Sequence, residues 1–87
     1  MDVVIKFTQS AFTHNVSEAD IRWAIDTAKY DGFIDEGKES ENKRLLIGFN
    51  QNANPLEIMY NILDNDTVRV FHAMKCRNAF KHLLEEE

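Results

Sequence analysis

Apolar and polar residues alternate with a period of two through much of the second half of the chain. This spacing sends successive side chains to opposite faces of a β-strand. It runs through residues 44–49, 56–63 and 67–74, which are separated by the turn-forming sequences NQNANP and DND. Three strands joined by short turns predict an antiparallel meander. A β-branched run at residues 3–7 predicts a strand ahead of it.

Two other segments have helical spacing. Ser17 and Asp20 resemble a capping box that would start a helix over residues 18–29, and Asn15 suits a turn with positive φ just before it. Apolar residues recur three and four positions apart in this helix: Ile21, Ala24, Ile25 and Ala28. The C-terminal sequence CRNAFKHLLEEE predicts a second helix. Its inward residues would be Ala79, Phe80, Leu83 and Leu84.

These elements predict the α+β class in a single domain over residues 1–87. We expect an early helix, a three- to four-stranded antiparallel sheet and a C-terminal helix. The sequence YDGFIDEGKESENK predicts a brief strand near residues 33–35 and then a solvated loop. A length of 87 residues with 44% hydrophobic composition suits one small domain with a modest core.

The same alternation assigns side chains to the two faces of the sheet. In the last strand, Arg69, Phe71 and Lys75 would share one face, and His72 would lie on the other unless the strand end bulges. Three outward apolar residues would form a patch for a helix or a partner protein to cover. They are Leu46, Met59 and Leu63.

Composition favours a cytoplasmic protein that does not enter membranes. The N-terminal residues lack a signal-peptide pattern, and no apolar run approaches the ~20 residues of a membrane helix. The single cysteine, Cys76, cannot form an internal disulfide, and we expect it to be a small buried residue. His72, Cys76 and His82 match no standard zinc spacing, so we expect neither a metal nor a cofactor.

Charge is unevenly distributed along this acidic chain. The formal net charge is -5, which argues against binding of nucleic acid. Residues 31–41 hold five acids and one Lys, however, whereas residues 67–84 hold two Arg, two Lys and no acid. The late segment can therefore present a local field opposite in sign to the total. The acidic segment is either a solvated loop or a surface on which a basic partner docks.

The sequence RLLIGFNQNANPLEIMYNILDNDTVRVFHAMKCRNAF has a strand ending in Gly, a turn into NPLE, a hairpin and a strand closing in HAMK. With the upstream HNVSEADIRWAI, it resembles small toxins of bacterial type II toxin–antitoxin systems, closest in kind to BrnT-like members of the RelE/ParE superfamily. Such chains often have a His-Gly-Val-Ser turn, and Asn15 replaces the Gly here. The resemblance covers residues 12–84. It implies helices on an antiparallel sheet, a neighbouring-gene antitoxin as partner and, in many members, cleavage of mRNA, in some cases on the ribosome.

Metal-independent RNA cleavage needs a base for the 2′-hydroxyl, cations for the phosphate and an acid for the 5′-oxygen. The candidate proton acceptors are His72 and Glu57, with Lys75 as a further catalytic cation. A bound anion would also relieve the cations at the start of the terminal helix. Four cations are candidates for binding and stabilising the phosphate, and one aromatic residue for stacking on a base. They are Arg44, Arg69, Lys75 and Arg77, with Phe71 as the aromatic.

Each candidate also has a structural interpretation. Arg44 and Arg69 suit ordinary solvated positions, and Glu57 suits a cross-strand partner for either of them. His72 suits a satisfied polar residue at a strand end. Two alternatives to a ribonuclease therefore remain open. One is a non-enzymatic interaction module with the same fold, which the acidic net charge favours, and the other is a toxin that acts on a target other than RNA.

Overall fold

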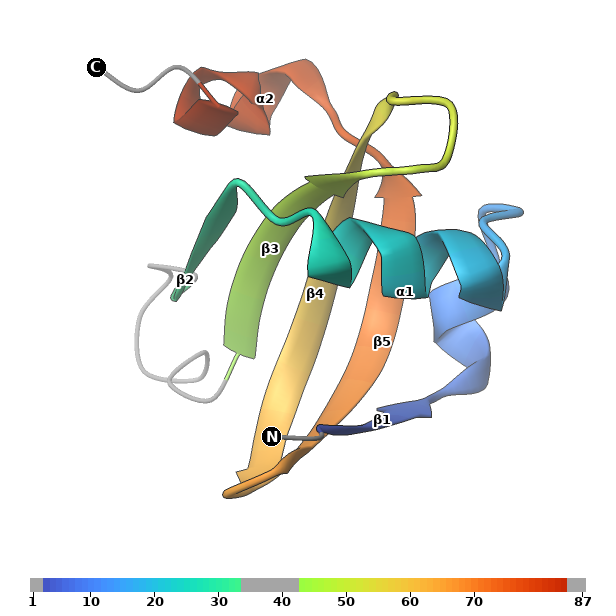
Figure 1. Cartoon of the computed structure of the whole chain (residues 1–87), viewed down its shortest axis with the longest axis vertical. Helices are drawn as coiled ribbons and strands as arrows, with labels where there is room; N and C mark the ends of the chain where they lie inside the picture. Colours follow the sequence, from blue (N-terminus) through green and yellow to red (C-terminus); the bar gives the residue numbers. More distant parts are fainter. Residues whose placement is uncertain (1–2, 34–42, 85–87) are drawn as a thin grey trace.

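The computed structural model describes residues 3–33 and 43–84. Within these residues, five strands form one sheet in the order β1-β5-β4-β3-β2 (Figure 1). The strands are β1 (Val4–Phe7), β2 (Tyr30–Phe33), β3 (Lys43–Phe49), β4 (Pro55–Asp64) and β5 (Thr67–Lys75). The helices are α1 (Glu18–Asp26) and α2 (Asn78–Lys81), with 3-10 helices η1 (Gln9–Phe12) and η3 (His82–Leu84).

The α+β class and the meander of β3, β4 and β5 are confirmed. The sheet, however, has five strands rather than three or four, and it is mixed rather than purely antiparallel. β1 runs parallel to β5, with Val4 opposite Thr67, so the first strand lies at the edge beside the last. β2 forms the opposite edge and pairs antiparallel with β3. The strand expected near residues 33–35 is found earlier, as β2, and residues 34 and 35 lie outside the described part.

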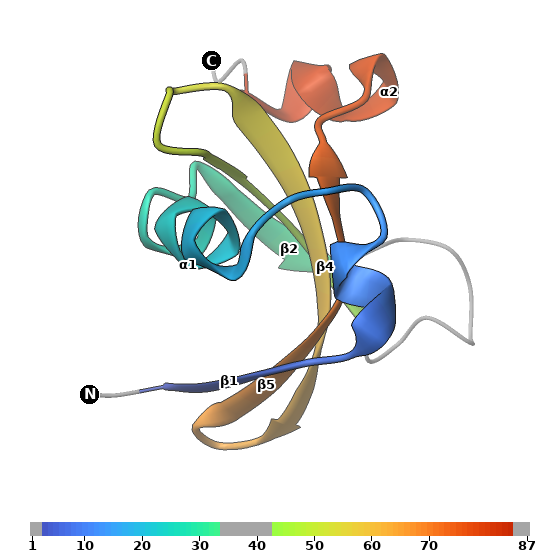
Figure 2. The ribbon, with the colours of Figure 1, turned by 90° about the vertical axis from the view of Figure 1, so that its right-hand side faces the viewer.

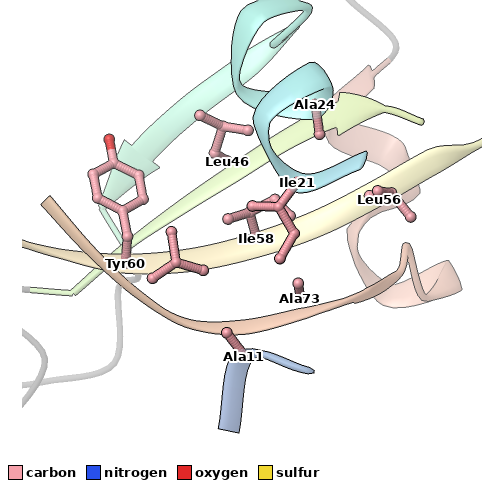
Figure 3. Close-up of a cluster of buried hydrophobic side chains, with 9 residues drawn as sticks. Ala11, Ile21, Ala24, Leu46, Leu56, Ile58, Tyr60 and Ala73 are labelled. Atoms are coloured by element: carbon pink, nitrogen blue, oxygen red, sulfur yellow. The ribbon is translucent and has the colours of Figure 1, made fainter. Parts of the chain in front are cut away.

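Helices cover both faces of the sheet (Figure 2). We call the two faces the α1 face and the α2 face. The α1 face carries the larger cluster of buried side chains (Figure 3): Ala11, Ile21, Ala24, Leu46, Leu56, Ile58, Tyr60, Val70 and Ala73. On the α2 face, Leu45, Ile47 and Cys76 are buried beneath residues that include Met59, Phe80, Leu83 and Leu84.

The caps of α1 show why the predicted start was correct and the predicted end was not. The Ser17 hydroxyl accepts a hydrogen bond from the Asp20 N–H, and Asn15 has a φ of 63° in the turn before it. The helix ends at Asp26 rather than near residue 29. There the Thr27 hydroxyl donates to the Trp23 carbonyl and accepts from the Phe49 N–H, which ties the helix end to β3.

The predicted apolar patch does not exist as one surface. Leu46 pairs with Ile58 and is buried beneath α1, whereas Met59 packs on the α2 face and Leu63 is exposed. The terminal helix is also shorter than predicted. Phe80, Leu83 and Leu84 do pack inward, but Ala79 is exposed.

A β-bulge at Phe71 changes the faces of β5. Met59 pairs with His72 and Tyr60 pairs with Val70, so Phe71 is the extra residue. Val70 and Ala73 therefore lie in the same buried cluster although they are three residues apart. The Phe71 carbonyl accepts a 2.7 Å hydrogen bond from the Ser10 hydroxyl in η1. Beyond the bulge every side chain lies on the face opposite to the one that the alternation predicted.

Gly48 lets α1 approach the sheet closely. A Cβ at this position would lie 1.9 Å from the Ala24 carbonyl oxygen, so Gly48→Ala would push the helix off β3. We expect a loss of about 2 to 3 kcal/mol in the free energy of unfolding, measured by urea denaturation. Gly32→Ala is the matched control, because its Cβ would meet the movable Tyr30 side chain. An equal loss in the two variants would contradict this account.

Candidate active site

A buried carboxylate lies on the α2 face. The Glu57 side chain in β4 is 0% exposed. Its Oε2 lies 2.9 Å from Nε2 of His72 and 2.6 Å from Nη2 of Arg77. Its Oε1 accepts a 3.0 Å hydrogen bond from the Arg77 backbone N–H. The Arg77 Nε donates to both carboxylate oxygens as well, at 3.1 and 3.0 Å. We call Glu57, His72 and Arg77 the carboxylate cluster.

Three elements position this cluster. Glu57 pairs with Met74 across the ladder, and the bulge sets His72 beside Met59 on the same face. Arg77 is the N-cap residue of α2, so Glu57 satisfies a backbone N–H where β5 turns into the helix. An anion was expected to bind beside the cations at the start of the terminal helix. The carboxylate of Glu57, a side chain of the protein itself, occupies this place. The interpretation of Glu57 as a partner of Arg44 or Arg69 is wrong, because its partners are Arg77 and His72.

The hydrogen bonds decide the ionisation of Glu57. Burial would raise the pKa of this carboxyl, because a charge loses its hydration there. Hydrogen bonds from the Arg77 side chain, the Arg77 N–H and His72 outweigh that effect and hold the pKa below its usual value. Glu57 is therefore a carboxylate at neutral pH and acts only as an acceptor.

The ionised carboxylate fixes the tautomer of His72. Because Glu57 can only accept, Nε2 of His72 carries the proton and donates it across the 2.9 Å contact. Nδ1, which carries the lone pair whenever the ring is neutral, bonds to no described residue. Every buried side-chain nitrogen and oxygen in residues 3–33 and 43–84 has a hydrogen-bond partner, so Nδ1 is open to solvent. His72 is therefore an imidazole whose orientation is set by a buried carboxylate.

His14 lies beside the carboxylate cluster, although no catalytic pattern in the sequence marked it as a candidate. Its ring meets the His72 ring edge-on, with 5.7 Å between centroids. It follows η1, which β5 holds through the hydrogen bonds from the Thr8 N–H to Val70 and from Ser10 to Phe71. The signal was the HNVS sequence, where the positive φ of Asn15 turns the chain after His14 toward α1. Only the bulge and η1 together bring this residue beside His72.

The predicted group of phosphate-binding cations is not gathered at one place. Arg69 and Lys75 were expected on one face, but the bulge separates them. Arg69 lies opposite Asn61 on the α2 face and donates to its side chain, whereas Lys75 pairs with Leu56, which faces α1. Phe71, expected beside Arg69, is the half-buried bulge residue. Lys75 and His72 do lie on opposite faces, as predicted.

Arg44 belongs to a separate polar group on the α1 face. Its Nε lies 3.1 Å from the Tyr60 hydroxyl and 3.3 Å from Oδ1 of Asp31, and its guanidinium stacks on Phe33 at 4.4 Å. Of the predicted site residues, the structure therefore brings together Glu57, His72 and Arg77. It places Arg44, Arg69 and Lys75 elsewhere.

Two further properties concern the described residues. In residues 3–33 and 43–84, no three or more His, Cys, Asp or Glu side chains are grouped so that they could hold a metal ion. No helix in this part of the chain is both long enough and apolar enough to cross a membrane.

We expect Glu57→Gln to destabilise the fold by about 3 kcal/mol at pH 7, because it removes a buried charge that balances Arg77. The pKa of Glu57 is lower in the folded than in the unfolded state, so its ionisation stabilises the fold above the unfolded value of about 4.5. This stabilisation is lost as pH falls below that value. Urea denaturation between pH 3 and 7, values chosen to span this transition, measures both effects.

Glu18→Gln is the control for this experiment. It removes the same charge from an exposed pair with Arg22 on α1, and we expect a change within about 0.5 kcal/mol. Glu57→Gln should also flatten the acid limb of the stability curve. A variant that kept the full acid dependence would show that other carboxylates cause it.

Comparison of the chain with models of protein families, with curated proteins and with solved structures found no match.

Proposed function

We propose that this chain is the toxin of a type II toxin–antitoxin pair and that it cleaves RNA without a metal ion. The resemblance of residues 12–84 to BrnT-like toxins supports the biological role. The hydrogen bond between His72 and the buried carboxylate of Glu57 is the observation that carries the chemistry. It orients an imidazole with a free basic nitrogen, which is what activation of a 2′-hydroxyl requires.

In this mechanism Nδ1 of His72 takes the proton from the 2′-hydroxyl of the substrate. The 2′-oxygen bonds to phosphorus as the bond from phosphorus to the 5′-oxygen breaks. The protonated ring of His14 gives its proton to the departing 5′-oxygen. The products are a 2′,3′-cyclic phosphate and a 5′-hydroxyl. Because RNA supplies the nucleophile, neither Ser nor Cys takes part.

The surroundings of the two rings fit this division of roles. Glu57 stabilises the imidazolium that His72 becomes when it accepts the proton, and it acts as a positioning residue. His14 is exposed and bonds to no described carboxylate, so it suits the acid. The Arg77 side chain is 51% exposed, so it can neutralise Glu57 and contact a phosphate with its outward edge. A centroid separation of 5.7 Å lets one phosphate contact both rings.

A non-enzymatic interaction module is the second candidate. The dispersal of the cations favours it, because Arg44 is paired with Asp31 and Lys75 lies on the face opposite His72. The net charge of -5 also opposes binding of RNA by long-range attraction. In a non-enzymatic module, the carboxylate cluster would have a structural role alone and would hold α2 against the sheet.

Induced expression in a bacterial host, with and without the adjacent gene, separates these functions. We expect growth arrest and discrete new message ends by primer extension, both reversed by the neighbouring gene. His72→Gln should abolish the arrest, whereas the control Arg69→Ala, on the same face but outside the cluster, should leave it intact. Arrest with intact messages would indicate a target other than RNA. Normal growth would favour the interaction module.

Substrates with different leaving groups test the roles of the two histidines in purified protein. On an ordinary oligonucleotide, His14→Ala and His72→Ala should each lower the cleavage rate by about 100-fold or more. On a substrate with sulfur in place of the 5′-oxygen, the thiolate leaves without a proton. On that substrate, His14→Ala should lower the cleavage rate only slightly, whereas His72→Ala should still lower it strongly. Equal losses for His14→Ala on both substrates would rule it out as the acid.

A further inference from the structure

The α1 face contains a pocket that the proposed site does not use. Its volume is about 240 Å³, and its lining residues come from α1, from all five strands and from two positions just outside these elements. Most of the residues that line it are aliphatic: Val3, Ile5, Ile25, Ala28, Leu46 and Val68. Asp31 and Tyr60 complete the lining. His72 and Glu57 lie on the opposite face, so this pocket is independent of the ribonuclease proposal.

One end of the pocket is polar and has an unused acceptor. The Tyr60 hydroxyl donates a 2.7 Å hydrogen bond to Oδ1 of Asp31, and Arg44 contacts the same oxygen at 3.3 Å. Burial, followed by the bond to Asp31, raises the pKa of Tyr60 to about 12, so its proton stays on the hydroxyl. Among the described residues, both side-chain contacts of the Asp31 carboxylate are made by its Oδ1. The Asp31 side chain is 42% exposed, and Oδ2 is left for a cationic donor.

Exposed apolar side chains extend the pocket into a wider surface. Val3, Phe33 and Ile62 are exposed large hydrophobic residues on this face. Val3 lines the pocket, Ile62 pairs with the pocket residue Val68, and Phe33 carries the stacked Arg44. The pocket is smaller than the roughly 300 Å³ at which small-molecule sites begin, but it suits one long side chain. A pocket for one anchor within an apolar surround is typical of protein interfaces.

We propose that this surface docks a basic amphipathic segment of a partner protein. An aliphatic stem enters the pocket, its cationic head reaches Oδ2 of Asp31, and neighbouring apolar residues cover Val3, Phe33 and Ile62. Charge complementarity selects this occupant. The pocket offers a carboxylate oxygen, and the whole chain carries a formal net charge of -5, which attracts a basic segment and repels a second copy of itself.

The probe is a synthetic amphipathic peptide of Leu, Ala and Lys, titrated into the whole protein and followed by amide chemical shifts. The control peptide has Glu in place of Lys. We expect the basic peptide to bind, with shifts at Ile5, Asp31, Leu46 and Val68 and none at His72, while the acidic peptide does not bind. Shifts spread over both faces, no binding, or a dimer that already buries these residues would overturn the proposal.

Two matched variants separate the specific contact from net charge. Asp31→Asn and Glu18→Gln each remove one negative charge, but only Asp31 faces the pocket. We expect Asp31→Asn to weaken binding by about fivefold or more and Glu18→Gln by less than about twofold. Val3→Ser, at an exposed position near the N-terminus, should weaken binding without changing thermal stability. Equal losses in the two charge variants would mean that net charge alone attracts the peptide, and would overturn the site.

Discussion

The buried charge of Glu57 is the constraint on which the α2 side of the molecule depends. A carboxylate that is removed from water must be balanced and hydrogen-bonded, and here His72 and Arg77 do both. The three residues come from β4, β5 and the start of α2, so the charge of Glu57 helps to fix the positions of these three elements relative to one another. The last of these is short and, apart from this contact, is held by a small apolar cluster. The same interaction that ties the start of α2 to the sheet also orients the imidazole of His72.

The two faces of the sheet are therefore stabilised in different ways. The α1 face holds the larger core, and Gly48 allows the helix to lie directly on β3. The α2 face has fewer buried apolar residues and uses the carboxylate cluster in addition. The Arg44–Asp31–Tyr60 group makes its own hydrogen bonds on the α1 face, apart from the carboxylate cluster. The cations that are separated in this way cannot act as one patch. Of the residues that the sequence predicted for catalysis and phosphate binding, the structure therefore brings only Glu57, His72 and Arg77 together.

Local signals in the sequence predicted the α+β class, the start of α1 and the meander, but neither the number of strands nor the parallel pairing of β1. Ser17 and Asp20 located the start of α1, and the alternation along residues 44–63 gave the strands of the meander, because both depend on neighbouring residues. The bulge at Phe71 could not be predicted in this way. Its carbonyl is bound by Ser10, which is distant in sequence, and no property of residues 67–75 alone reveals it. That single insertion separated Arg69 from Lys75, and it also brings His72 toward His14.

The parallel pairing of β1 with β5 has a consequence for the order in which the protein folds. Val4 pairs with Thr67, so β1 finds its partner only after about sixty further residues have been synthesised. Until then, the apolar residues of β1 and the free edge of β5 stay exposed. Such distant contacts slow folding and leave strand edges open to association. The meander can form from neighbouring segments, whereas the pairing of β1 with β5 joins segments that are distant in sequence.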